Sequence, residues 1–287
     1  MPTQPLLAAC PLGCSSHLTA TQIVLPEGAL RRCSACGQLV SQAGADRYAS
    51  SMLEFDDPRG TAPDPRASAR REQLAHRRVH ALAAELDMPT KTLKLLDVGC
   101  SSGAFLESAR KLGCAVHGVE PATRAAESAR SQGLDVFNGT LEAARFPDTS
   151  FDAATLFEVI EHLVAPIDLL REIHRVLRPG GVLLVGTGNA DSWTVRTLGA
   201  RWDYFSIDRH GGHISFFNPG SMRLAAQRAG FETIRIETRN VNLQEPYRRH
   251  SLRYRASKLL GQALNVPARS AHRGHDMLAL LRRPAAH

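Results

Sequence analysis

Short apolar runs alternate with amphipathic segments between about residue 92 and residue 190. The apolar runs predict strands, because each is too short for a helix and ends at a small or polar residue. The amphipathic segments predict helices, because their apolar residues recur at helical spacing. The predicted strands are residues 93–98, 115–119, 134–137, 151–157 and 182–185, and the predicted helices are residues 104–112, 122–132 and 167–177. Buried strands separated by helices are typical of an α/β fold with a parallel sheet covered on both faces.

The flanking regions extend this pattern. Residues 56–65 contain three prolines and a glycine and predict a linker. A helix is expected over residues 66–87, and the apolar residues on its buried side are Leu74, Val79, Leu82 and Leu86. Further helices are expected at 221–229 and 247–264, and further strands at 231–237 and 276–281. The whole pattern predicts a doubly wound, Rossmann-like sheet of seven mostly parallel strands.

The composition fits a globular protein, since 43% of its residues are hydrophobic and 22% are charged. No apolar run approaches the roughly 20 residues that cross a bilayer. The N-terminus lacks the charged segment and long apolar stretch of a secretory signal. We therefore expect a cytoplasmic protein.

The positive charge is concentrated in the last third of the chain. Residues 191–287 contain 16 basic and 7 acidic residues, a net charge of +9. A basic surface attracts phosphates, nucleic acid or anionic lipid, but it also occurs as a solvated face without a partner. The predicted helix 247–264 combines basic residues with Leu252, Leu259, Leu260 and Leu264. It fits contact with a diphosphate, a carrier or a membrane surface, and it also fits packing on the domain with a charged outer face.

Four of the six cysteines lie within the first 36 residues, in the order Cys10-x3-Cys14 and Cys33-x2-Cys36. Closely spaced pairs of this kind can enclose a structural zinc ion with four thiolates. The alternatives are four buried or free cysteines, or a site in which His17 replaces one ligand. We therefore expect a zinc ribbon over residues 1–45, a linker and helix over 46–90, and a catalytic domain over 91–287.

The first strand of the predicted sheet leads into a turn of small residues, Asp97-x-Gly99-x-Ser101-x-Gly103. Ligands of open parallel sheets bind at the carboxyl ends of the strands. A glycine-rich turn is shared with dinucleotide-binding enzymes and is weak evidence by itself. However, this turn begins with an acid, and a second acid, Glu120, ends the next strand, where it can accept hydrogen bonds from ribose hydroxyls. A turn with an acid suits a cationic sulfonium nucleoside better than a pyrophosphate.

The order of these motifs resembles the class I S-adenosylmethionine-dependent methyltransferases. Further segments match that family at residues 134–142, 146–152, 157–163 and 175–181, so the resemblance covers about residues 90–240. It implies that Asp97, Gly99, Cys100 and Gly103 line the methionine and ribose of the cofactor. It also implies that Glu120 holds the ribose, Pro121, Thr140 and Leu141 border the adenine, and Phe157 contacts the cofactor. Considered alone, Asp97 could simply be an acidic residue that caps a helix or stabilises a turn. Glu120 alone could be an acidic surface residue at the end of a strand. The Cys-rich N-terminal segment of this chain is similar to the extensions that precede the catalytic domain of some sugar C-methyltransferases.

Three histidines are candidates for the base that an oxygen or carbon nucleophile needs. His162 follows the fourth strand, while His210 and His213 lie in the aromatic segment 201–217. This segment is expected to cover the active site and line the acceptor, although a packed connection with aromatics in the core is the alternative. Similarly, His162 fits a residue that only orients its loop.

The predicted function is methylation of a small molecule or glycan intermediate at oxygen or carbon. A nucleic-acid methyltransferase is disfavoured, because no Asn-Pro-Pro-Tyr-type motif follows the fourth strand. A non-catalytic cofactor-binding module and a nicotinamide-dependent oxidoreductase remain as alternatives.

Overall fold

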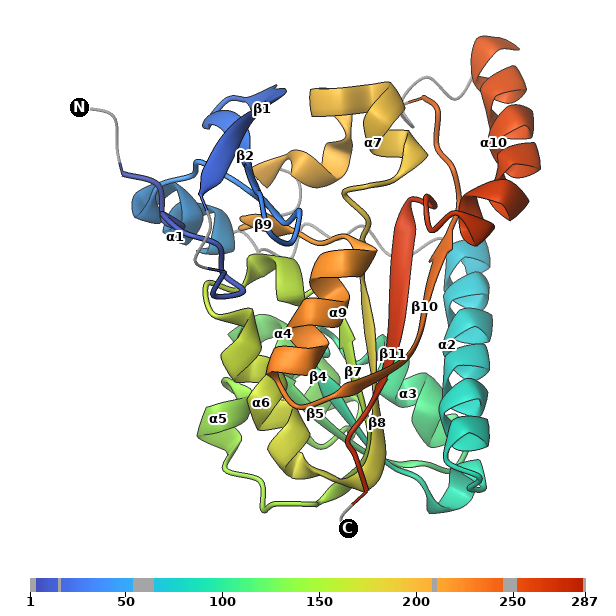
Figure 1. Cartoon of the computed structure of the whole chain (residues 1–287). Helices are drawn as coiled ribbons and strands as arrows, with labels where there is room; N and C mark the ends of the chain where they lie inside the picture. The colour runs from blue at the N-terminus through green and yellow to red at the C-terminus, as the bar shows by residue number, and fades with distance from the viewer. Residues whose placement is uncertain (1–3, 15–16, 54–64, 208–210, 245–251, 286–287) are drawn as a thin grey trace.

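The computed structural model describes residues 4–14, 17–53, 65–207, 211–244 and 252–285. It contains a large sheet flanked by helices and a smaller sheet beyond one end of it (Figure 1). Among the described residues, no helix has both the length and the apolar content that crossing a membrane requires.

The large sheet has seven strands in the order β10-β11-β8-β7-β4-β5-β6. Five neighbouring strands, β8 to β6 in that order, are parallel, whereas β11 runs antiparallel to both β8 and β10. The strands are β4 (Lys94–Val98), β5 (Ala115–Glu120), β6 (Val136–Asn138), β7 (Phe151–Phe157), β8 (Leu177–Gly188), β10 (Glu232–Arg239) and β11 (Asp276–Arg282). The predicted seven-stranded, mostly parallel Rossmann-like sheet is confirmed.

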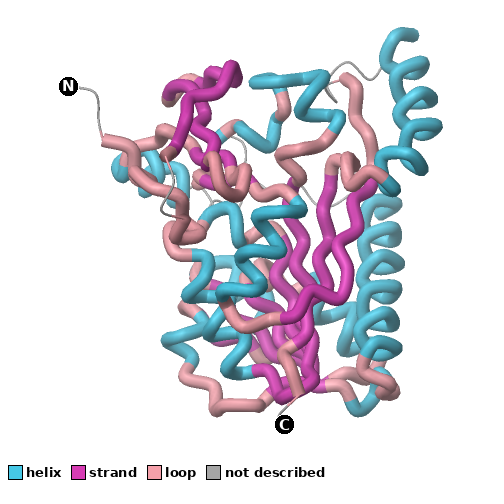
Figure 2. The backbone as a smooth tube through the Cα atoms, in the orientation of Figure 1, coloured by secondary structure: helices cyan, strands magenta, loops and turns pink. Residues whose placement is uncertain are grey.

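Helices cover both faces of this sheet, as Figure 2 shows with the strands in magenta and the helices in cyan. They are α2 (Pro65–Glu85), α3 (Ala104–Lys111), α4 (Thr123–Ser131), α5 (Leu141–Ala144), α6 (Pro166–Val176), α9 (Pro219–Arg228) and α10 (Leu252–Ser270). Helix α7 (Trp193–Leu198) instead packs with residues of the smaller sheet. Short 3-10 turns are η2 (Thr90–Thr92), η3 (Ile160–His162), η4 (Gly199–Arg201) and η5 (Asp203–Phe205).

The two faces of the sheet build separate cores because successive strand residues point to opposite sides. Leu95 packs with Val79 and Leu82 of α2 on one face. Its neighbour Leu96 belongs to the core on the other face, which includes Leu170 of α6 and helix α9. The parallel strands are therefore buried on both sides, as their near-continuous apolar sequence predicts.

Three local predictions need correction or adjustment. Leu74 was expected on the buried side of α2 but is 41% exposed, since the helix packs against the sheet only further along, at Val79 and Leu82. Strand β8 begins at Leu177, before the Pro-Gly-Gly sequence that was expected to precede it, because Leu177 already pairs with Phe151 of β7. The basic helix α10 extends to Ser270, and the first residues of its predicted range, 247–251, lie outside the described part of the chain.

The small sheet joins the N-terminal segment to a later part of the chain. Its strands are β1 (Leu18–Leu25), β2 (Gly28–Cys33), β3 (Leu39–Val40) and β9 (Ser215–Phe216), and helix α1 (Ala45–Leu53) follows β3. Strand β3 pairs with β9 in the register Leu39 to Phe216. The boundary at residue 45 stays a prediction, and the predicted linker at 56–65 lies outside the described residues except for its last position.

Candidate active site

The turn after β4 requires glycine at two positions. Gly99 and Gly103 have φ values of 74° and 82°, in the region that other residues rarely adopt. A Cβ atom on Gly99 would lie 2.4 Å from Cγ2 of Val159, and one on Gly103 would lie 2.4 Å from Cδ1 of Leu134. Helix α3 begins directly after Gly103 without a side-chain cap, so its first N–H groups point into the same region. Glycine is therefore required for the fold of this turn, because protein side chains fill the space that a Cβ atom would need.

Asp97 lies at the end of β4 and is only 3% exposed. Thr155 of the adjacent strand β7 donates a hydrogen bond to Oδ1 of Asp97 at 2.6 Å. Burial raises the pKa of Asp97 to about 7, and the nearby Glu120 carboxylate adds to that rise. The buried carboxyl is therefore placed where a cation in the site would favour its charged form.

Glu120 links the turn after β4 to the turn after β5. Its Oε2 accepts a hydrogen bond from the backbone N–H of Ser101, and its Oε1 accepts one from Ala122, both at 2.8 Å. A carboxylate has about four acceptor positions, so two remain for hydroxyl donors. Since β4 and β5 are parallel neighbours, Asp97 and Glu120 lie at the same edge of the sheet. The structure thus brings together the two acids that the motif analysis paired.

The predicted adenine-side residues lie at the ends of β5 and β6. The Asn138 side chain donates to the backbone oxygens of Glu120 and Pro121 at 3.0 and 3.1 Å and holds the two strand ends together. Thr140 caps α5 by accepting from Ala143 at 3.3 Å, and the side chain of Leu141 is buried in the main core. Thr140 and Leu141 therefore stabilise the segment after β6, whether or not a ligand is bound there.

Cys100 is buried, and its sulfur lies 2.7 Å from where a Cβ atom on Gly118 would be. Burial raises the pKa of its thiol, so the side chain stays neutral. It packs in an apolar cluster with Leu106, Ala126 and Val136.

Phe157 ends β7, and a cationic side chain stacks on its ring. The guanidinium carbon of Arg78, from α2, lies 4.2 Å from the Phe157 ring centroid. Burial lowers the pKa of Arg78, while the charges of Glu158, Asp276 and Asp97 favour its charged form. Arg78 was not identified from the sequence, because nothing in the Arg-rich segment of α2 distinguishes it from its neighbours.

Two of the three predicted histidines lie together in a buried polar cluster. The rings of His162 and His213 have centroids 4.5 Å apart, and the residues are 8% and 2% exposed. The Nδ1 atom of His213 lies 2.7 Å from the backbone oxygen of Tyr204, and its Nε2 lies 3.7 Å from Oε1 of Glu161. His210 lies outside the described residues.

Glu161 is at the centre of this cluster and is fully buried. The hydroxyl of Tyr204 donates to its Oε1, and the hydroxyl of Thr187 donates to its Oε2 at 3.0 Å. Burial raises the pKa of Glu161, whereas these two hydrogen bonds lower it. One ligand atom each from Glu161, His162 and His213 lies within 4.8 Å of the others, so the group can hold a proton or a small cation.

A cavity of about 570 Å³ lies between α2 and the strands β8, β10 and β11. Arg78, Phe157, Glu158 and Thr187 are among its lining residues, and Thr187 is also a hydrogen-bond partner of the buried Glu161. A second cavity of about 450 Å³ continues beneath α10. Both are lined by Arg70, Asn240 and Asp276.

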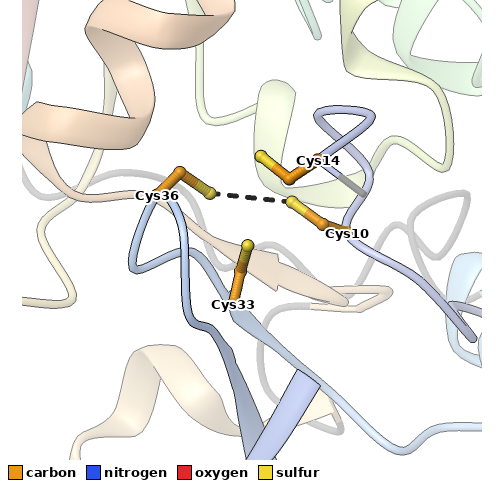
Figure 3. A group of neighbouring side chains, drawn as sticks. All are labelled: Cys10, Cys14, Cys33 and Cys36. Carbon is orange, nitrogen blue, oxygen red and sulfur yellow. Dashed lines mark hydrogen bonds between the residues drawn. The ribbon is translucent and has the colours of Figure 1, made fainter. Parts of the chain in front are cut away.

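The four N-terminal cysteines point toward one another, as Figure 3 shows. The four Sγ atoms all lie within 4.8 Å of one another, and those of Cys10 and Cys36 are 3.6 Å apart. A disulfide would bring two sulfurs to about 2.0 Å, whereas tetrahedral zinc with bonds of about 2.3 Å separates them by about 3.8 Å. All four cysteines are unbridged, so their spacing fits the metal.

A family model described as a methyltransferase domain matches residues 67–236, more than half of the chain. The chain belongs to this methyltransferase family. It is an S-adenosylmethionine-dependent methyltransferase, as the motifs of the first crossover predicted.

The relatives of this methyltransferase include ubiquinone biosynthesis O-methyltransferases. That of Cereibacter sphaeroides is 31% identical over 169 residues, which cover 53% of this chain and 68% of the relative. That of Caulobacter vibrioides is 33% identical over 163 residues, which cover 52% and 64%.

Solved structures share the fold of the methyltransferase. An S-adenosylmethionine-dependent methyltransferase from Mesorhizobium loti has a TM-score of 0.52 and 21% identity and covers 71% of this chain and 96% of its own. The [4+2]-cyclase SpnF has a TM-score of 0.50 and 24% identity and covers 75% and 83%. Because one of these neighbours is a cyclase, the fold alone does not specify methyl transfer.

Proposed function

We propose that this methyltransferase moves the methyl group of S-adenosylmethionine to an oxygen atom of a small-molecule acceptor. The buried cluster around Glu161, which reaches the 570 Å³ cavity through its partner Thr187, carries this proposal. The O-methylating relatives support it as well. A glycan intermediate is the second acceptor class, because the Cys-rich extension resembles that of some sugar methyltransferases.

The residues around the first crossover would hold the cofactor, which supplies an electrophilic methyl group when bound. Glu120 has the acceptor capacity for the ribose hydroxyls, and Asp97 would face the cationic amino group. Gly99, Cys100 and Gly103 would offer backbone contacts, and Pro121, Thr140 and Leu141 would border the adenine. Phe157 would contact the cofactor, and Arg78 on its ring would pair with the carboxylate of the methionine portion.

The acceptor hydroxyl must lose a proton as its oxygen is methylated. His213 donates from Nδ1 to the backbone oxygen of Tyr204, which leaves Nε2 as the proton acceptor on the side of Glu161. His162 lies against the same ring. We assign the base to this pair, with Glu161 stabilising the imidazolium that forms and Tyr204 holding Glu161 in place.

The cysteine cluster would bind one structural zinc ion, because four protein ligands leave no open position for chemistry. Two knuckle glycines, Gly13 and Gly37, have φ values of 76° and 73° and allow the turns beside the cysteine pairs. The small sheet has few strands of its own, so metal binding would stabilise it.

The decisive experiment is calorimetry with S-adenosylhomocysteine on the wild type and on Glu120→Ala. We expect the substitution to weaken binding at least about tenfold, on the order of 1.4 kcal/mol. Glu127→Ala, on the exposed face of α4, is the matched control. Equal affinities of wild type and Glu120→Ala would remove Glu120 from the ribose role.

The acceptor class needs a separate screen. Phenolic small molecules, glycan intermediates and RNA are offered to the enzyme with labelled cofactor, and products are identified by mass. Turnover of RNA with a steep salt dependence would instead indicate a nucleic-acid methyltransferase.

A further inference from the structure

Helix α10 carries large apolar side chains that face solvent. The exposed fraction is 75% for Val266, 68% for Leu259 and 54% for Leu260. Outside α10, the most exposed large apolar residues that the structure describes are Val24 of β1, at 63%, and Val164, at 45%, and they are far apart in the chain. The clustering on one helix therefore differs from the single exposed apolar residues that occur on most protein surfaces.

These side chains form a stripe along the outer side of the helix. An α-helix turns by about 100° per residue, so Leu259 and Val266, seven residues apart, lie nearly one above the other. The exposed Ala256 and Ala263 fall within about 80° of them and fill the stripe between the larger side chains. The stripe is thus continuous over most of the helix.

The inner side of α10 fixes this orientation. Gly261 and Ala268 are buried, and a Cβ atom on Gly261 would lie 2.3 Å from the backbone oxygen of Val241. Tyr254, Ser257 and Asn265 line the 450 Å³ cavity. Because close backbone packing and a polar cavity occupy the inner side, the helix cannot turn its apolar stripe inward.

Basic side chains flank the stripe. Arg255, Lys258 and Arg269 are exposed and lie on one side of it, between about 40° and 100° from Leu259. Arg269 also reaches Glu237 of β10 at 3.5 Å. Helix α10 contains no acidic residue. A second copy of the helix packed against this stripe would bring like charges together, whereas an anionic surface would complement them.

We propose that α10 docks the protein on an anionic lipid bilayer, lying in the interface with Leu259, Leu260 and Val266 inserted and the basic flank on the headgroups. Apolar burial and attraction to anionic lipid act together in such helices. This docking is independent of the acceptor and of the assignment of the base.

The test is co-sedimentation of the full-length protein with phosphatidylcholine vesicles that contain or lack phosphatidylglycerol. The variants are Leu259→Glu, Val266→Glu and Arg255→Gln, and Val24→Glu is the matched control at a similarly exposed apolar position away from α10. Circular dichroism checks that each variant is folded. Analytical ultracentrifugation without vesicles measures self-association.

We expect the wild type and Val24→Glu to bind anionic vesicles equally. Binding should fall at least about tenfold in each of the two glutamate variants of α10, and less in Arg255→Gln, with weak binding to pure phosphatidylcholine. Equal binding of Leu259→Glu and Val24→Glu would overturn the proposal. Absence of wild-type binding to anionic vesicles would also overturn it. The same holds for a wild-type dimer in solution that Leu259→Glu dissociates.

Discussion

The protonation of Asp97 gives a quantitative test of the site. The residue is 3% exposed, and burial raises its pKa from 3.8 to about 7. Each pKa unit corresponds to about 1.4 kcal/mol, so ionising Asp97 in the folded, cofactor-free protein costs on the order of 4 kcal/mol. The substitution Asp97→Asn removes this ionisation, and it keeps an oxygen that can accept the hydrogen bond from Thr155.

The sign of the effect follows from the direction of the shift. Because the folded-state pKa is raised, the folded protein holds the proton more tightly than the unfolded chain between pH 3.8 and about 7. The stability of the wild type relative to Asp97→Asn should therefore be highest at acid pH and fall as the pH rises through this range. At pH 8 the wild type should have lost about 3 to 5 kcal/mol relative to the variant.

The measurement is the free energy of unfolding by urea for both cofactor-free proteins at a series of pH values from 4 to 8. Other groups titrate in both proteins, so the difference between the two curves isolates Asp97. A difference that does not change with pH would refute the reasoning. As a second check, Thr155→Val removes a hydrogen bond that lowers the pKa, so the fall in stability should extend to higher pH.

Three further predictions concern other parts of the molecule. Gly103→Ala should destabilise the protein by about 2 to 4 kcal/mol in thermal or urea unfolding, because the φ of 82° is strained for alanine and its Cβ would overlap a side chain; unchanged stability would contradict the close packing. Tyr204→Phe should cost about 2 to 5 kcal/mol, since it leaves the buried N–H of Gly188 and one oxygen of Glu161 without their hydroxyl partner. Its pH–rate profile should also shift, which a purely structural role would not cause. Metal analysis should find about one zinc per chain in the wild type and less in Cys36→Ser, with a lower melting temperature; a metal-free wild type with full stability would exclude the zinc site.

The parts of the site that could be predicted from the sequence are those made by residues close together in the chain. Asp97 and the glycines of the turn are recognisable because one strand, one turn and one helix follow each other directly. Glu120 could be added because parallel neighbouring strands place their carboxyl ends at one edge. Its partners, the N–H groups of Ser101 and Ala122, come from the same two turns.

Contacts between distant segments could not be predicted in this way. Tyr204 meets Glu161 across 43 positions of the chain, and the aromatic segment around it fits a lid as well as a packed connection. The structure shows Trp202, Tyr204 and Phe205 buried together in one apolar cluster, as a packed connection requires, and a role of the segment in lining the acceptor stays a prediction. Arg78 was missed for the same reason, since its place on Phe157 depends on how α2 crosses the sheet.

The pairing of β3 with β9 couples the cysteine cluster to the histidine pair. Ile214, next to His213, donates its N–H to the backbone oxygen of Glu161 at 3.1 Å and accepts from the N–H of Ser41 at 2.8 Å. Removing the first 45 residues would strip the hydrogen bonds from this strand and expose the apolar side chains beneath it. The N-terminal segment therefore braces the backbone beside His213 and Glu161, so that oxidation of its thiols would disturb the residues proposed as the base through this backbone.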